Sequence, residues 1–409
     1  MTAPLILYDD ARARTFEPFA STRPLSELRA GAEIIRRRWE RVAHRPATGF
    51  ISAAHLERFA EFDAPRAASG TLPAGTLVVN ARFVPALGDL SNDGGQWTNG
   101  GVLAAVQLAS AVEAAQLATG EVTLEALATG HARGAPPSSG SSTIEGWWLN
   151  EVWDLVRLLP AMLDADVPAL AATLHVMTDP PLTVLGEHAA SIERGAFIEP
   201  FVLADTTAGP VLVCAGARVN AFTRLVGPCV IGPHAAVGGG RVSGCSIGEH
   251  ARVHGEISSS IIVGHANKAH DGFVGHSVIG RWANLGAGTV TSNLKNSYGE
   301  VSLWTPDGVR PTGMQFLGAL VGDHAKTGIG TRLTTGCVIG AGANVFGDRM
   351  PPKYVPPFSW GDAAPFAEYA LDRFLEVAAR VMRRRRVELT DDMRAALTVA
   401  WHRRNAFPA

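Results

Sequence analysis

Between about residues 183 and 348, an aliphatic residue followed by glycine recurs every five to six positions. Two variable residues and then a small or aliphatic residue complete each repeat, as in Ile247-Gly-Glu-His-Ala and Ile339-Gly-Ala-Gly-Ala. Each short strand of such a hexapeptide pattern buries one aliphatic side chain, and the glycine stands at a tight corner. With three strands and ~18 residues in each coil, the segment predicts a parallel β-helix of about eight or nine coils. A glycine-rich sandwich would require the regular spacing to be accidental.

The first part of the chain, residues 1–180, has a different pattern. Pro4–Tyr8 and Thr76–Val79 are apolar runs that predict strands, and residues 101–118 fit either a strand or a helix. A helix is expected late in this region, at Trp148–Leu159. A first helix is predicted by apolar residues at steps of three and four, namely Leu25, Leu28, Ala32, Ile35, Trp39 and Val42, with a solvated face at Arg36, Arg37, Arg38 and Arg41. Strands interleaved with helices favour an α/β sheet domain.

The last part, residues 349–409, begins with a proline-rich segment at Met350–Trp360 that predicts an extended linker. A helical segment is expected from about 365 to 404, with a second helix start at Thr390-Asp-Asp. Its run Arg383–Arg386 fits either a contact with a phosphate or a solvated or intersubunit face.

Charge and cysteine content narrow the classes of partner. Thirty-six Lys and Arg against 38 Asp and Glu give a net charge of −2, which offers no field to hold nucleic acid or an acidic membrane surface. No window reaches the roughly 18 apolar residues of a membrane span. The four cysteines are too scattered for a disulfide framework. We therefore expect a cytoplasmic protein whose partners are small molecules.

The repeat is interrupted twice, at Ile262–His276 and from Thr291 to about Gly313. Breaks in a regular scaffold are where functional residues usually lie, and a loop of ~20 residues inside a solenoid is rarely idle. We expect the second interruption to overhang a neighbouring coil.

The run Lys268-Ala-His-Asp-Gly-Phe-Val-Gly-His-Ser-Val-Ile-Gly-Arg-Trp-Ala-Asn-Leu-Gly-Ala-Gly-Thr-Val-Thr-Ser-Asn293 carries a resemblance to a known family. It is similar to the acetyltransferase signature of the bacterial bifunctional glucosamine-1-phosphate acetyltransferase/N-acetylglucosamine-1-phosphate uridyltransferases, in their divergent branch with a shortened N-terminal domain. The resemblance covers the repeat region well and the first third of the chain weakly. It implies a left-handed β-helix, a nucleotidyltransferase-like first domain and a homotrimer. It also implies acetyl-CoA, an amino-sugar 1-phosphate and a UDP- or dTDP-sugar product.

The resemblance assigns residues within the β-helix. The general base of the family falls on His270, and imidazole, with an ordinary pKa of ~6.5, can accept the proton that an attacking sugar amine must lose. Backbone N–H groups of the Gly-Ala-Gly turn could stabilise the oxyanion. The implied sugar-phosphate contacts are Asn284, Lys268, Phe273, Asn293 and Lys295, and the implied acetyl-CoA contacts are Gly286, Ala287, Lys326, Gly328 and Ala341.

This chain departs from the family pattern in the sugar-phosphate contacts. Phe273 stands where the family has tyrosine, and Ser258–Ser260 occupy the place of a basic residue. Other cations must therefore meet the sugar phosphate, and the candidates are Lys268, Arg252, Lys295 and Lys326.

The first domain lacks the glycine-rich phosphate loop of the family, and Ser21-Thr-Arg-Pro-Leu-Ser-Glu-Leu-Arg-Ala-Gly31 stands in that place. The resemblance then makes Arg23 and Arg29 candidate triphosphate contacts, with Asn80 beside the nucleotide. Asp9 and Asp10 are candidate ligands for a magnesium ion. Salt bridges at a helix start fit the two arginines equally well, and a catalytically inactive domain remains an alternative.

Two other functions fit the scaffold. His265, His270 and His276 suggest a zinc site of the carbonic anhydrase kind, in which three imidazoles converge on the metal. A non-catalytic sugar-nucleotide sensor is the other. His234, His250 and His324 occupy variable corner positions and are expected to face solvent.

Overall fold

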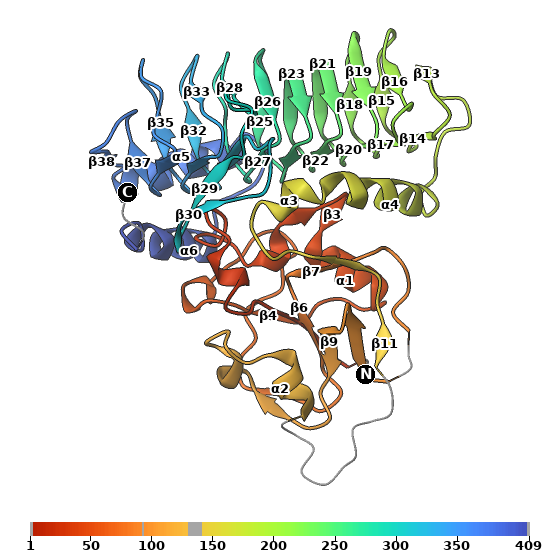
Figure 1. The fold of residues 1–409 in the computed structure, drawn as a ribbon, viewed down its shortest axis with the longest axis vertical. Helices are drawn as coiled ribbons and strands as arrows, with labels where there is room; N and C mark the ends of the chain where they lie inside the picture. Colours follow the sequence, from red (N-terminus) through yellow and green to blue (C-terminus); the bar gives the residue numbers. More distant parts are fainter. Residues whose placement is uncertain (1–2, 92–93, 130–140, 407–409) are drawn as a thin grey trace.

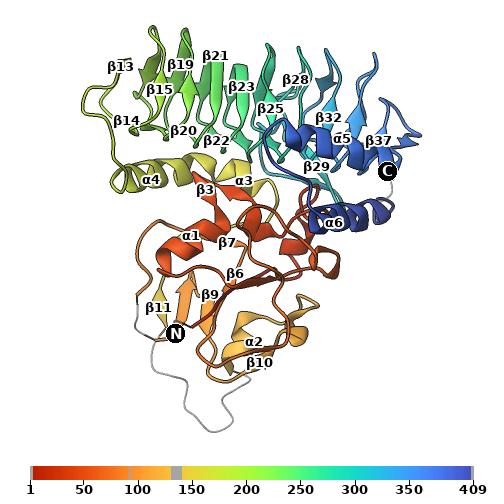
Figure 2. The same ribbon diagram turned by 180° about the vertical axis from the view of Figure 1, so that it is seen from behind.

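The computed structural model describes residues 3–91, 94–129 and 141–406. Figures 1 and 2 show an α/β domain below, a β-solenoid across the top and two C-terminal helices beside the junction of the two. The predicted combination of a sheet domain, a parallel β-helix and a helical C-terminal segment is confirmed.

The first domain is built on a six-stranded mixed sheet with the order β11-β8-β9-β6-β1-β4. The central strand β1 pairs in parallel with both β4 and β6, and β9 is antiparallel to β6. The predicted strands at Pro4–Tyr8 and Thr76–Val79 become β1 and β6. The bounds are β1 (Leu5–Tyr8), β4 (Gly49–Ile51), β6 (Leu77–Asn80), β8 (Gln96–Asn99), β9 (Val102–Gln107) and β11 (Ser142–Thr143).

The helix predicted from Leu25 begins only at Ile35, as α1 (Ile35–Val42). Before it, Leu25–Glu27 forms one 3₁₀ turn, and the short antiparallel strands β2 (Arg29–Ala30) and β3 (Glu33–Ile34) follow. Gly31, between these strands, has φ +63°, and a Cβ there would lie 2.2 Å from an Asp166 oxygen. The apolar spacing predicted a helix because each of these short elements buries its own apolar side chain.

The other helices of the first domain are α2 (Leu124–Thr129), α3 (Asp154–Arg157) and α4 (Leu159–Ala171). The helix expected at Trp148–Leu159 is therefore shorter than predicted, because β12 (Gly146–Trp148) precedes it and α4 starts a new helix. Helix α4 packs against β17 and β20 of the solenoid.

The solenoid has one sheet facing the first domain and further sheets on its other faces. All strand pairs of the domain-facing sheet are parallel, and aliphatic residues such as Ile231, Ile247 and Ile279 are buried. In order, its strands are β14 (Ala190–Ile192), β17 (Val211–Val213), β20 (Cys229–Ile231), β22 (Ser246–Ile247), β24 (Ile261–Ile262), β27 (Val278–Ile279), β31 (Ala319–Val321), β34 (Cys337–Ile339) and β36 (Tyr354–Val355).

A second face carries the strands that lead to the solenoid edge farthest from the first domain. Its outward side chains form a column in register, which we call the asparagine column: Arg252, Asn267, Asn284, Lys326 and Asn344. The strands that carry the column are β23 (Arg252–Ser258), β25 (Asn267–Lys268), β32 (Lys326–Thr327) and β35 (Asn344–Val345), and β26 (Phe273–Gly275) follows β25 on the next face.

One solenoid corner is turned by histidines and a tryptophan in the left-handed conformation, with φ between 53° and 64°. Their rings follow one another at 4.5–6.2 Å, in the order His234, His250, His265, Trp282 and His324. The expectation that these corner histidines face solvent is correct for His234 but wrong for His324, which is 5% exposed. The ring of Phe374 contacts His324, and Phe62 covers His265.

The second interruption of the repeat forms the hairpin β29 (Ser302–Thr305) and β30 (Gly308–Pro311). It overhangs neighbouring coils as expected, since Trp304 stacks on Tyr354 with ring centroids 3.5 Å apart. Arg310 continues to the first domain, where it pairs with Glu151 at 2.7 Å. The hairpin therefore ties the solenoid to the first domain.

The proline-rich segment is extended, and its strands β36 and β37 (Ser359–Trp360) continue the solenoid sheets. The strand β38 (Ala367–Glu368) then runs antiparallel to β37. At the other end, the first strand β13 (Thr183–Leu185) is exposed along its whole length.

The C-terminal helices are α5 (Leu371–Arg383) and α6 (Asp391–His402). Thr390 caps α6, because its hydroxyl accepts a hydrogen bond from the Met393 amide. Among the helices in the described part of the chain, none combines the length and apolarity that a bilayer crossing requires.

Candidate functional site

An open groove lies at the solenoid edge farthest from the first domain, where β25 turns into β26. His270 is exposed in this groove, and Ala287 of the next coil lies opposite it. The structure thus brings together the predicted base and the predicted Gly-Ala-Gly turn. The lining residues are Gly238, His254, Ala269, His270, Asp271, Ala287, Gly288, Ile329 and Gly330.

Lys268 supports the His270 turn from inside the solenoid. Its side chain is 1% exposed, and the ammonium donates to the carbonyl oxygens of His254 (3.4 Å), Asp271 (3.1 Å) and His270. Burial lowers its pKa. The prediction that Lys268 meets a sugar phosphate does not fit this placement, because its ammonium is held by two carbonyl oxygens of the turn and one of the preceding coil.

His254 is a groove residue that sequence reasoning missed. Its Nδ1 lies 2.9 Å from the Gly238 carbonyl oxygen and its Nε2 lies 2.9 Å from Asp271 Oδ1. Both partners are acceptors, so each ring nitrogen lies at hydrogen-bond distance from an acceptor, and the ring is fixed beside His270. The signal lies in the coil register, which sets Val253 opposite Lys268 and hence places His254 beside Ala269.

The Gly-Ala-Gly turn offers one free donor to the groove. Gly286 N–H donates to the Thr327 hydroxyl (3.0 Å), and Gly288 N–H donates to the Asp271 carbonyl (3.1 Å). Within the described residues, the N–H of Ala287 has no hydrogen-bond partner. Ala287 is therefore the donor that can stabilise an oxyanion.

The remaining predicted acetyl-CoA contacts differ in their burial. Ala341 is fully buried and cannot touch a ligand in the groove. Lys326 donates to the His324 carbonyl at 3.0 Å, and burial lowers its pKa to about 8. Gly328 is half-buried and follows Lys326 on the same face, with its N–H bonded to the Val345 carbonyl.

The predicted sugar contacts lie apart from the groove. Asn284 belongs to the asparagine column and is not among the groove-lining residues described here. Asn293 contacts His276 (Nδ2 to Nδ1, 2.9 Å), and Phe273 is half-buried on the next face. Lys295 and Arg332 line a separate hollow on that face.

In the first domain, Asp9 and Asp10 follow β1, and Asn80 ends the neighbouring strand β6. Asp9 accepts hydrogen bonds from the Ser52 hydroxyl (2.5 Å) and the Leu25 amide (3.1 Å), and burial raises its pKa to about 6. Burial alone would also raise the pKa of Asp10, but its contacts with Arg82 and Asn80 lower it.

These contacts bear on the predicted magnesium site. Both aspartates are held by donors of the protein, so the pair does not fit a magnesium site as the chain is arranged. Across the described ranges, no group of three or more His, Cys, Asp or Glu is arranged to hold a metal ion.

Arg23 and Arg29, the predicted triphosphate contacts, lie in the interface between the first domain and the solenoid. Arg23 is 2% exposed and pairs with Asp323 (2.7 Å) and Glu61 (2.9 Å). Arg29 is buried against the Ala32 carbonyl. Neither guanidinium is accessible to a triphosphate, so the salt-bridge interpretation of Arg23 is the one that fits.

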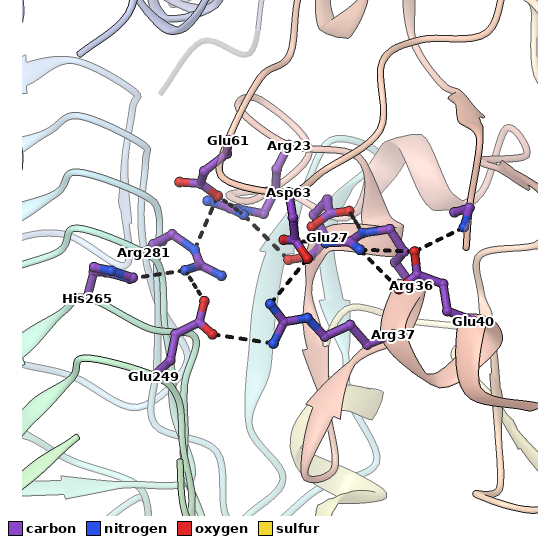
Figure 3. A network of polar contacts seen from close by, with 11 residues as sticks. Arg23, Glu27, Arg36, Arg37, Glu40, Glu61, Asp63, Glu249, His265 and Arg281 are labelled. Atoms are coloured by element: carbon purple, nitrogen blue, oxygen red, sulfur yellow. Dashed lines mark hydrogen bonds and ion pairs between the residues drawn. The ribbon is translucent and has the colours of Figure 1, made fainter. Parts of the chain in front are cut away.

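Glu61 is the centre of this interface (Figure 3). It also pairs with Arg281 (3.2 Å) and accepts a hydrogen bond from the Trp282 indole (3.0 Å). Burial alone would raise its pKa, but Arg23 and Arg281 lower it to about 2. Arg281 in turn pairs with Glu249 at 2.8 Å.

Arginines of α1 form buried ion pairs next to this network, although the sequence predicted that this face of the helix is solvated. Arg36 is 2% exposed and pairs with Glu27 (2.6 Å), and Arg38 is fully buried against Asp166. On that face only Arg41 is exposed, and Arg37 is half-buried.

A hollow of about 290 Å³ opens beside the carboxyl end of β4 in the first domain. Small residues dominate its wall, which leaves backbone groups accessible. The lining includes Ser52, Ala53, Glu57, Ala68, Ser69, Gly70 and Ala114. Ligands of open parallel sheets bind outside the carboxyl ends of the strands, so this hollow is the candidate ligand site of the domain.

The three histidines of the zinc hypothesis lie in different environments. His265 is buried and accepts a hydrogen bond from Arg281 (3.1 Å), His270 is in the groove, and His276 contacts Asn293. They do not converge within this chain.

Comparison with known proteins matches parts of the chain. Residues 5–174, most of the first domain, match the family model described as sugar nucleotidyl transferase. A bifunctional sugar-1-phosphate nucleotidylyltransferase/acetyltransferase of Sulfurisphaera tokodaii is 38% identical over 74 residues, 18% of each chain. The bifunctional protein GlmU of Methanococcus vannielii is 36% identical over 81 residues, 19% of each chain. The chain thus matches about a fifth of the length of these curated relatives.

Among solved structures, the UDP-N-acetylglucosamine acyltransferase of Arabidopsis matches 51% of this chain and 80% of its own, at 11% identity and a TM-score of 0.25. That of Campylobacter jejuni matches 54% and 94%, at 10% identity and a TM-score of 0.26. At such scores the likeness transfers no property to this chain.

Proposed function

We propose that the solenoid groove transfers an acetyl group from acetyl-CoA to the amine of an amino-sugar 1-phosphate, such as glucosamine 1-phosphate, with His270 as general base. The observation that carries the proposal is the exposed imidazole of His270 facing the free N–H of Ala287 across an open groove. The local identity to two bifunctional relatives supports it.

The groove residues fit the chemistry step by step. His270 takes a proton from the sugar amine while the nitrogen attacks the thioester carbonyl, and Ala287 N–H donates to the oxyanion that forms. When the tetrahedral intermediate collapses, the C–S bond breaks and the thiolate of coenzyme A leaves. The imidazolium of His270 then returns its proton to that sulfur.

The sugar phosphate requires cations near the groove. The ammonium groups of Lys268 and Lys326 are buried where they donate to carbonyl oxygens. The bonds of Lys295 and Arg332 to the Glu300 and Asp348 carbonyls lie at the surface, beside the neighbouring hollow that both side chains line, so we assign the phosphate contact to these two. Phe273 lies on the same face, between that hollow and the His270 turn.

We further propose that the first domain binds the nucleotide in the hollow beside β4 and that the full reaction yields a UDP- or dTDP-linked N-acetylated sugar. Acetyl-CoA sites of the resembling family lie between adjacent β-helices, so we also propose a homotrimer. A monomer in light scattering that still acetylates would contradict the trimer.

One assay tests the main proposal. The protein is mixed with acetyl-CoA and a panel of hexosamine 1-phosphates, with and without UTP or dTTP, and the products are identified by mass spectrometry. His270→Ala should lower kcat by about 10²–10⁴-fold and leave KM for acetyl-CoA nearly unchanged. His234→Ala, at an exposed corner outside the groove, is the matched control. Near-normal turnover by His270→Ala would refute the assignment.

Burial of Arg23 and Arg29 favours a second candidate for the first domain, a sugar-nucleotide sensor without turnover. It predicts nucleotide binding without pyrophosphate release. Release of pyrophosphate with any sugar phosphate and nucleotide would exclude it.

A further inference from the structure

Helix α5 carries the run Arg383–Arg386 along the solenoid to the asparagine column. Near its start, Phe374 packs against Phe358 (4.9 Å) and His324 (5.9 Å) of late coils. Near its end, Met382 lies with Trp282 and Arg23 at the junction of the domains. Figure 2 shows the helix lying against the strands of this end of the solenoid. The run Arg383–Arg386, at the end of the helix, therefore lies over the coil that contains Asn267.

Arg385 is seated on this face by a single hydrogen bond. Its Nη2 donates to Asn267 Oδ1 at 2.5 Å, and the side chain is half-buried. Arg252 is exposed and lies opposite Asn267 in the strand register. Burial, followed by the charges of Arg252 and Arg384, lowers the pKa of Arg385 to about 10. Three guanidinium groups thus gather at one place, which we call the arginine cluster: Arg252, Arg384 and Arg385.

The cluster has no counter-charge in the described parts of the chain. None of its members pairs with a carboxylate there, and the same holds for Arg383 and Arg386. The buried arginines of the domain interface are different, since Arg23, Arg36 and Arg281 each pair with carboxylates. Like charges held together without a partner repel, and an anion that bridges them would be bound favourably.

We propose that the arginine cluster binds the diphosphate group of a small molecule. Guanidinium groups pair with phosphate oxygens through two parallel hydrogen bonds, and adjacent phosphates offer enough oxygens for several guanidiniums. Asn267 precedes His270 by three residues, about 10 Å along an extended chain. A ligand anchored by its diphosphate at the cluster therefore reaches the groove. Coenzyme A and nucleotide sugars both carry that group, and only the choice of coenzyme A rests on the proposed function.

Inorganic pyrophosphate is the probe that tests the site, by titration calorimetry on the full chain. Arg384→Gln combined with Arg385→Gln should weaken pyrophosphate binding at least tenfold. The matched control is Arg373→Gln with Arg380→Gln, which removes the same charge from exposed positions of α5 and should bind as the unaltered protein does. Equal binding by both double variants, or none by the unaltered protein, overturns the proposal. Thermal unfolding of both variants checks the fold.

Competition then identifies the source of the diphosphate. Displacement of pyrophosphate by coenzyme A assigns the cluster to the acyl donor, and displacement by UDP-N-acetylglucosamine assigns it to a sugar nucleotide. Failure of both to displace pyrophosphate overturns the proposal. The proposed acetyl transfer can be refuted separately. If the protein binds pyrophosphate through the cluster but releases no coenzyme A in the acetylation assay, the cluster proposal stands and the role of His270 as general base is refuted.

Discussion

His265 shows how a single side chain responds to the fold. Its Nδ1 accepts a hydrogen bond from Arg281 at 3.1 Å, which requires a neutral ring with the proton on Nε2. Burial, followed by the charge of Arg281, lowers its pKa to about 3. Burial does the same to His324, whose pKa also falls to about 3. Both rings are therefore uncharged at neutral pH.

This predicts a pH dependence of stability. In the unfolded chain each histidine takes up a proton near pH 6.5, whereas in the fold it stays neutral down to about pH 3, so stability is lost as pH falls through this window. Each of the two rings lowers the free energy of unfolding by about 1.4 kcal/mol for every pH unit below 6.5. His324→Gln should flatten the fall of the free energy of unfolding between pH 7 and 5, measured by urea titration.

Two carboxyl groups act in the opposite direction. Burial raises the pKa of Asp9 to about 6 and that of Glu17 to about 7, so these groups favour the fold as pH falls. The comparison of variant with unaltered protein cancels their effect. An unchanged slope in His324→Gln would show that this ring is not kept neutral.

Lys268 gives a prediction about positioning. Replacing it with Met keeps the length of the side chain but removes the three donor contacts that shape the His270 turn. We expect Lys268→Met to lower kcat about tenfold without changing the pH at which activity is half-maximal, because the base itself is intact. Arg241→Met, at an exposed position outside the groove and the arginine cluster, should leave kcat unchanged. A raised KM for the sugar phosphate with normal kcat would instead make Lys268 a phosphate contact.

At the same scale, the sequence predicts the placement of His270 and Ala287 but not that of Arg23. The motif spans adjacent coils, and coil length fixes which residues meet. Arg23, by contrast, pairs with Asp323, which lies 300 positions away in the chain. Local patterns contain no information on a contact that forms only when two domains dock.

At the scale of elements, the repeat was readable because each coil carries its own copy of the pattern. The structure of the segment from Leu25 to Val42 could not be predicted from its pattern. A 3₁₀ turn, a two-strand hairpin and α1 bury apolar residues there at the spacing expected of one helix. Gly31, which has φ +63°, is the sequence signal for the interruption of this helix pattern, because glycine is favoured where the chain must turn.

The hairpin β29–β30 leads to a prediction about its anchor. Trp304 stacks on Tyr354, and Trp304→Ala removes that contact and part of its burial, so the free energy of unfolding should fall by about 2 kcal/mol. The groove lies elsewhere on the solenoid, so the KM for acetyl-CoA should stay the same. Val309→Ala, at an exposed position of the same hairpin, serves as control and should cost little. Loss of acetyl-CoA affinity in Trp304→Ala would link the hairpin to the groove.

At the scale of the molecule, three further sets of contacts, besides the packing of α4 on β17 and β20, fix the first domain to the solenoid. These are the ion network around Glu61, the Arg310–Glu151 pair of the hairpin, and the junction that α5 and α6 share with Arg23 and Trp282. The expected result is one cooperative unit in which the domains do not move independently.

Glu61→Gln tests this coupling. The change removes a buried charge that holds both Arg23 and Arg281, and the loss of one partner of a buried pair costs about 3–5 kcal/mol. Urea unfolding should then split into two transitions as the domains separate. The control Glu376→Gln, from an exposed pair with Arg380, should cost about 0.5 kcal/mol or less. A single transition at the original urea concentration would mean that the interface contributes little.

The two ends of the solenoid differ, and the difference limits how molecules can stack along its axis. The first strand, β13, is exposed and offers an open parallel edge, whereas β38 closes the other end by running antiparallel to β37. A head-to-tail filament needs two complementary edges on each subunit, and β38 covers the edge of β37 that would otherwise face the next molecule. The turn that reverses the chain after Trp360 thus keeps this sheet from offering a parallel edge to a second molecule.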